Sequence, residues 1–187
     1  MMIWVLTVVL WLGVPLAFPQ TQPLASAERK FQHIEQNARL GHPDQTPTVL
    51  TEDEVNAYLA SGHVDLPEGV KSVRFRGKVG VIEALTRVDF DEITASRRSS
   101  NPLLRLFTGT HNVHVVARAK GAGGMGQVHV DSVEIDGVSV PRAALQFFLE
   151  RYITPKHPEV ALDTTFKLPY KIDIAIVGSE KLTITQK

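Results

Sequence analysis

The sequence predicts an α+β fold: a curved antiparallel β-sheet of about six strands with helices packed on one face. Segments with an apolar residue at every second position follow one another and are joined by short glycine-containing turns, as in antiparallel sheets. Two helical patterns precede these segments and a third interrupts them. The chain has 187 residues, 43% of them hydrophobic, which is enough for one domain with its own core.

Two helices are predicted in the first third of the chain. Residues 28–39 have the pattern of a short polar helix, and a loop follows up to Pro47. Thr51, followed three residues later by Glu54, has the form of a capping box, in which each side chain satisfies a free backbone N–H group at the helix start. Gly62 supplies the C-terminal stop of this second helix.

The sheet is predicted to begin with a hairpin. Apolar and polar residues alternate over residues 70–76 and again over 82–90, with a glycine turn between them. Residues 91–101 are polar and predict a loop. Pro102 then opens a short apolar turn that ends at Phe107.

Four strands and one helix are predicted in the rest of the chain. The strands cover residues 113–119, 128–135, 165–177 and 182–185. A shift in the phase of the apolar residues indicates a bulge near Asp131. Pro141 suits the first position of a helix that continues to about Ile153.

The first 27 residues differ in character from the rest of the chain. Ile3–Ala17 is a run of 15 residues without charge, and Ala25-Ser26-Ala27 has the small-x-small form of a signal peptidase site. A helix of that length spans about 22 Å, less than the hydrocarbon core of about 30 Å. The sequence therefore predicts a signal peptide over residues 1–27, followed by a helix and linker (28–48) and an α+β domain (49–187).

No Lys or Arg precedes the apolar run, so an uncleaved membrane anchor formed by residues 3–17 is the alternative. Either way we expect an extracytoplasmic protein, periplasmic or secreted, that meets a membrane only through this segment.

Composition excludes several classes of function. The chain has 20 basic and 20 acidic residues, so its formal net charge is zero and we expect no nucleic-acid partner. It contains no Cys, which excludes disulfides, a thiol nucleophile, an iron–sulfur cluster and a cysteine zinc site.

No segment indicates a familiar enzyme class. Residues 121–126 match the G-x-G-x-x-G pattern, but a strand follows them where a dinucleotide site needs a helix, so we interpret them as a hairpin turn. There is no G-x-S-x-G, H-E-x-x-H, phosphate-binding loop or calcium loop. We assign no catalytic residue, no metal ligand and no cofactor, and we favour a non-enzymatic protein.

Two groups of polar residues have alternative interpretations. If Val115 faced Val130, His114 and His129 would be diagonal neighbours near Asp131, and the three could form a metal site or simply lie on an exposed face. Basic residues also recur at alternate strand positions, which fits either a solvated outer face or a platform for anionic lipid headgroups or a wall polymer. They are Arg74, Arg76, Lys78, Arg118 and Lys120.

The helix after Pro141 is apolar over more than one face, so it is either buried on two sides or lines a cavity. The apolar turn that ends at Phe107 offers a second surface. The sequence predicts that a hydrophobic ligand lies between them, with simple core packing as the alternative. The predicted ligand-binding side chains are Leu103, Leu106, Phe107, Leu145, Phe147, Phe148 and Tyr152.

Two short stretches carry a family resemblance. Residues 51–59 (TEDEVNAYL) resemble the opening helix of exported YpmS-like proteins. Residues 133–141 (VEIDGVSVP), which lead into the apolar helix, are similar to a turn in tubular lipid-binding (TULIP-like) exported proteins. This resemblance implies an extracytoplasmic α+β protein with a lipid or other hydrophobic ligand, and it implies no catalytic residue.

Three functional hypotheses follow from the sequence. The first is a non-enzymatic envelope protein that binds a lipid or other apolar small molecule. The second is a structural or assembly factor that binds another envelope protein, for example along a strand edge. The third is a hydrolase with an unfamiliar site, for which His114, His129 and Asp131 are the candidates.

Overall fold

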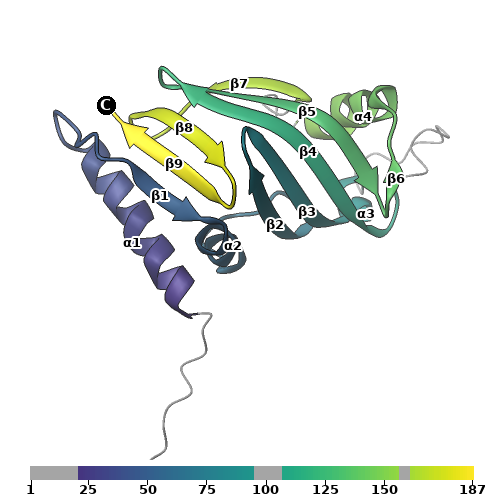
Figure 1. Ribbon diagram of the computed structural model, residues 1–187. Coiled ribbons are helices and arrows are strands. Elements are labelled where there is room, and N and C mark those ends of the chain that lie inside the picture. The colour runs from purple at the N-terminus through teal and green to yellow at the C-terminus, as the bar shows by residue number, and fades with distance from the viewer. Residues whose placement is uncertain (1–20, 95–106, 156–160) are drawn as a thin grey trace, which may run out of the picture.

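Alternating apolar residues produce a single antiparallel sheet that branches at one strand. The computed structural model describes residues 21–94, 107–155 and 161–187, and in them an α+β fold with nine strands (Figure 1). The helical elements are α1 (Thr21–Ala38), α2 (Glu52–Ala60), α3 (Phe90–Thr94), α4 (Arg142–Phe148) and the π-helical turn η2 (Leu149–Ile153). The strands are β1 (Thr48–Thr51), β2 (Val70–Lys78), β3 (Val81–Asp89), β4 (Thr110–Ala122), β5 (Met125–Ile135), β6 (Val138–Ser139), β7 (Asp163–Lys167), β8 (Ile172–Gly178) and β9 (Lys181–Gln186).

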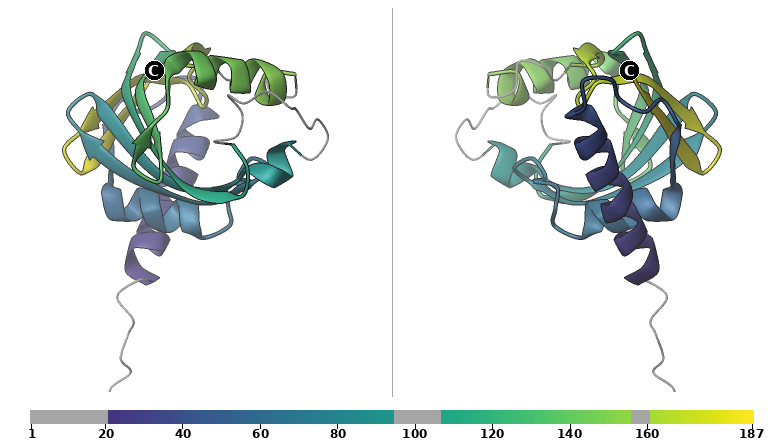
Figure 2. Two further views of the ribbon diagram at one scale, coloured as in Figure 1. Left: turned by 90° about the vertical axis from the view of Figure 1, so that its right-hand side faces the viewer. Right: turned by 90° about the vertical axis from the view of Figure 1, so that its left-hand side faces the viewer.

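The long strand β4 organises the sheet. The main order is β1-β9-β8-β4-β3-β2, and β5 pairs with β4, β6 and β7. β8 meets β4 at Gly121, which pairs with Ala175 beyond the part of β4 that pairs with β3. Figure 2 shows the strong curvature of the strands, and Figure 1 shows α4 and α3 at one end of the sheet and α1 and α2 at the other.

Two clusters of buried side chains pack the helices against the sheet. The first joins the inner face of β3, β4 and β5 to α3, α4 and η2. The second joins β1, β8 and β9 to α1, with Ile34 and Leu50 at its centre. Val113 and Gly121 lie an even number of positions apart on β4, so they are on the same face of that strand. Val113 belongs to the first cluster, and Gly121 faces Ala175 of the second. The predicted α+β class, with helices on one face of a curved sheet, is confirmed.

Several local predictions are also confirmed. Thr51 and Glu54 form the capping box of α2, and Gly62 follows that helix with a φ of 81°. Gly123 and Gly124 form the two-residue turn between β4 and β5, so the G-x-G-x-x-G segment is a hairpin turn. The partner of β4 jumps from Ser132 to Val130, which leaves Asp131 as the bulged residue.

The predicted single strand over residues 165–177 is wrong. The segment forms β7 and β8, which are separated by Leu168–Lys171. Pro169 has no N–H group for a sheet ladder, and Tyr170 and Lys171 have φ angles of 52° and 53°, which lie in the left-handed region and outside the β region of a regular strand. Alternating apolar residues on both sides of the break make the two strands look continuous in the sequence.

The structure also contains two short elements that the sequence pattern does not predict, and one helix that begins earlier than predicted. β1 has four residues, and α3 occupies the start of a predicted loop. α1 begins at Thr21, seven residues before the predicted start at Glu28. The predicted cleavage triplet therefore lies inside α1, where Ala27 has 0% exposure.

A buried ionic network holds α1 against α2. The Glu54 carboxylate accepts hydrogen bonds from Ser26 Oγ (2.6 Å), Lys30 Nζ (2.6 and 2.7 Å) and the Thr51 backbone N–H (2.7 Å). Burial raises the pKa of the Glu54 carboxyl, but these donors outweigh burial and hold that pKa below its ordinary value. Ser26 and Ala27 thus contribute to the contact between the two helices.

Candidate ligand-binding cavity

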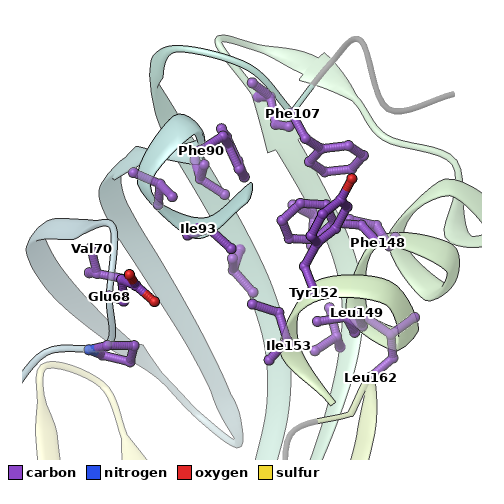
Figure 3. Close-up of a pocket in the computed structure, with 18 of the residues that line it drawn as sticks. Glu68, Val70, Phe90, Ile93, Phe107, Phe148, Leu149, Tyr152, Ile153 and Leu162 are labelled. Atoms are coloured by element: carbon purple, nitrogen blue, oxygen red, sulfur yellow. The ribbon is translucent and has the colours of Figure 1, made fainter. Parts of the chain in front are cut away.

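An apolar cavity of about 440 Å³ lies between the inner face of the sheet and the helical elements α3, α4 and η2 (Figure 3). Its floor is formed by the sheet residues Val70, Val88, Val113, Val115, Val130, Val133 and Ile135. Its other walls are formed by Pro67, Glu68, Phe90, Ile93, Phe107, Leu145, Phe148, Leu149, Tyr152, Ile153, Ala161 and Leu162. We refer to this space as the apolar cavity.

A cluster of aromatic rings closes one side of the apolar cavity. Phe107 stacks on Phe148 with ring centroids 4.2 Å apart, and Phe90 meets both rings edge-on at 5.4 and 5.6 Å. Tyr152 lies 5.2 Å from Phe148. These separations are typical of favourable aromatic pairs, so the cluster is a stable wall of the cavity.

The π-helical turn determines which side chains of the last helix face the cavity. α4 passes directly into η2, where the backbone N–H of Thr154 bonds to the carbonyl of Leu149 (2.8 Å), five residues earlier. The wider turn places Leu149, Tyr152 and Ile153 together along the cavity. Single π turns of this kind occur frequently at functional sites.

The structure brings most of the predicted ligand-binding side chains together. Phe107, Leu145, Phe148 and Tyr152 line the apolar cavity. Phe147 does not line it and is 38% exposed. Leu103 and Leu106 lie outside the described residues, so their contribution stays a prediction.

The sequence prediction did not include the sheet floor or α3. Apolar alternation in the strands identified the inward-facing valines as core, but it contained nothing to show that a cavity lies above them. Phe90 and Ile93 lie on α3, in and next to a stretch interpreted as a polar loop. Their pairing at i and i+3 was the available signal, but it is a weak one in a helix of five residues.

His111 fastens the chain segment that carries Phe107. Its ring nitrogens lie 2.6 Å from the Asp136 carboxylate and 2.6 Å from the Thr108 carbonyl. Both partners can only accept, so both nitrogens must donate, and the charged imidazolium fits the site best. The hydrogen bond to Asp136 and the one to Thr108 raise the pKa of His111 above its ordinary value, while burial opposes this.

The register of the β4–β5 hairpin separates the histidines proposed for a metal site. Val115 pairs with Val133, not with Val130 as the sequence suggests, because the two-residue glycine turn and the bulge at Asp131 together fix the pairing. His114 therefore lies opposite Glu134, and His129 lies opposite Arg118. In residues 21–94, 107–155 and 161–187, no group of three or more His, Cys, Asp or Glu side chains is arranged to hold a metal ion.

The basic residues on the outer face of the sheet alternate with acidic ones. Lys78 pairs with Glu83 (2.5 Å), and Arg118 pairs with Asp131 (2.8 Å). His129 bonds to Asp163, which also accepts from Arg142 (2.7 Å). This mixed pattern fits the solvated outer face better than a purely basic platform.

No protein-family model, curated protein or solved structure matches this chain. The helices of the described segments also lack the length and hydropathy that a membrane span requires. The function must therefore be inferred from the site itself.

Proposed function

We propose that this protein binds a lipid or another hydrophobic molecule in the apolar cavity and has no catalytic activity. One observation carries the proposal: a cavity of about 440 Å³ whose described lining is apolar except for Glu68 and Tyr152. Ligand sites in proteins commonly enclose about 300–1,000 Å³ and combine apolar walls with a few polar groups.

The driving force for binding is the removal of apolar surface from water. Burial contributes about 25 cal/mol for each Å² of apolar surface, and a ligand in this cavity contacts aliphatic and aromatic side chains on the sheet side and on the helix side. The floor and the aromatic wall are already formed in the structure, so binding costs little ordering of those elements.

The proposal also concerns location. We propose an extracytoplasmic protein, supported by the uncharged run Ile3–Ala17. Because Ser26 and Ala27 pack in α1, a chain cleaved after Ala27 would lose the hydrogen bond from Ser26 to Glu54. Mass measurement of the protein's N-terminus after expression distinguishes removal of residues 1–27 from retention as an anchor.

Native mass spectrometry of protein purified without detergent tests the binding function. We expect an extra mass that extracts into chloroform. Val130→Phe adds volume to the cavity floor and should remove the extra mass, whereas Val79→Phe changes a side chain that is 82% exposed and should keep it.

Other results would contradict the proposal. If Val130→Phe folds and carries the same mass as the parent protein, the ligand lies elsewhere. A protein that carries no lipid but retains one stoichiometric protein partner supports the assembly-factor hypothesis instead.

A further inference from the structure

The strand β7 has one edge that pairs with no other strand of the described residues. β7 pairs with β5 alone, and Figure 1 shows it at the margin of the sheet. The Leu168 N–H donates to the Gly124 carbonyl (2.8 Å), so the even-numbered residues of this segment bond to β5. Because alternate residues of an antiparallel strand point to opposite sides, Asp163, Thr165 and Lys167 direct their N–H and carbonyl groups away from β5.

The edge of the sheet at β2 is partly covered by side chains of α2. Asn56 bonds to the N–H (2.7 Å) and the carbonyl (2.9 Å) of Phe75, and the Glu52 carboxylate accepts from the Gly77 N–H (3.1 Å). These side chains occupy positions that an added strand would need. In the described part of the chain, no side chain takes the same place beside β7. β7 is therefore an edge to which a further strand can be added.

The sequence of β7 is complementary to itself in one antiparallel register. Its two ends carry opposite charges, Asp163 and Lys167, and Thr165 lies midway between them. When two copies are centred on Thr165, Asp163 of each copy lies directly opposite Lys167 of the other. Opposite charges in such cross-strand pairs stabilise a sheet, and like charges destabilise it. A shift by two residues places a charged residue opposite Thr165 and loses both ion pairs, so the charges specify one register.

The other face of β7 fits the same register. Phe166 is 41% exposed, and in this register it lies opposite Thr164 of the second copy, which covers part of its ring. Pro169 has no N–H group, so the ladder ends at Lys167. Three outward-pointing residues on each copy then form about six hydrogen bonds. Since so short an interface buries little surface, we expect a weak dimer that dissociates on dilution.

We infer that β7 is a dimerisation edge: two copies of the chain pair their β7 strands antiparallel about Thr165 and join their sheets. Both copies use the same residues, so the interface closes at two copies and forms no longer assembly. The inference goes beyond the proposed function and does not depend on a ligand.

Sedimentation velocity of the full chain over a wide range of protein concentration tests the dimer. Lys167→Asp turns both ion pairs into pairs of like charge and should weaken self-association about 5-fold or more. Lys120→Asp makes the same charge change at an exposed residue of β4, two strands away from this edge, and should leave self-association unchanged. A parent protein that stays monomeric at every concentration, or equal effects of the two variants, would overturn the inference.

A cross-link tests the register directly. The chain contains no Cys, so Thr165→Cys introduces a single thiol. Opposite residues of a hydrogen-bonded pair have Cα atoms about 5.5 Å apart, within the range of about 4.4–6.8 Å that a disulfide spans. Mild oxidation should therefore join two copies of Thr165→Cys but not two copies of Lys120→Cys, as read from a gel without reductant. Absence of the cross-link at residue 165, or an equal yield at residue 120, would contradict pairing about Thr165.

Discussion

The side chain of Asn56 hydrogen-bonds to the open edge of the sheet. The loss of stability on its removal can therefore be worked out from two hydrogen bonds. β2 is an edge strand, and the backbone of Phe75 points its N–H and carbonyl away from β3. Asn56 donates from Nδ2 to the Phe75 carbonyl (2.9 Å) and accepts from the Phe75 N–H at Oδ1 (2.7 Å). One amide side chain of α2 thus takes the place of a residue of a missing neighbouring strand.

Asn56→Ala removes both hydrogen bonds. Each contributes about 0.5–1.5 kcal/mol to stability, so the free energy of unfolding should fall by about 1–3 kcal/mol. For a chain of this length, each kcal/mol lowers Tm by about 2–4 °C, which gives a total of about 2–12 °C. Urea denaturation and differential scanning calorimetry measure the two quantities.

Asn56→Asp tests the geometry of the pair. The aspartate keeps the acceptor for the Phe75 N–H but places a second oxygen against the Phe75 carbonyl, so it should destabilise the protein at neutral pH. Below about pH 4 the protonated carboxyl can donate again, and the stability difference from the parent protein should shrink. The reasoning is refuted if Asn56→Ala costs less than about 0.5 kcal/mol, the range of an ordinary surface substitution, or if the Asn56→Asp difference does not depend on pH.

Two further predictions concern the His111 contact and the close approach at Gly121. Because the folded-state pKa of His111 is raised, its contribution to stability is complete below its ordinary pKa of 6.5 and is lost as the pH rises through the raised value. Unfolding of the parent protein and of His111→Gln at about pH 6 and about pH 9 should show this loss in the parent protein alone, and an equal loss in both would contradict it. Gly121→Ala places a Cβ atom 2.8 Å from the Ala175 Cβ and 3.0 Å from its backbone nitrogen, so it should cost about 1–3 kcal/mol in urea denaturation. Gly41→Ala, which meets nothing within 4 Å, is the matched control, and equal stability of the two variants would show that β4 and β8 are not packed this closely.

Local signals in the sequence predicted the features that depend on a few neighbouring residues. The capping box at Thr51 and the bulge at Asp131 follow from short-range hydrogen bonds and apolar phase, which the sequence displays directly. The pairing of His114 with Glu134 depends on the turn length at Gly123 and Gly124 and on the bulge together. Pairing Val115 with Val130 shifts β5 along β4 from its true register. In that shifted register His114 and His129 become neighbours, which they are not in the structure.

The candidate site was predictable only where its residues follow a local helical pattern. Phe148 and Tyr152 belong to a helical stripe, and helical periodicity found them. Phe147 was included because the stripe is wide, but the direction of a helix relative to the sheet is a tertiary property. The π turn at Leu149–Ile153 leaves no periodic pattern in the sequence, although it decides which residues of this segment face the cavity.

The composition of the cavity floor explains both why the cavity exists and why the sequence did not reveal it. Val113, Val115, Val130 and Val133 are β-branched, so they suit a strand whether or not anything lies above them. They are also short, and opposite them stand the long side chains of η2 and the aromatic cluster. Leucine or phenylalanine at the same floor positions would fill the space and give an ordinary core. The short floor residues thus keep the volume that the proposed ligand occupies, which is why the test of function adds volume at Val130 instead of removing a wall residue.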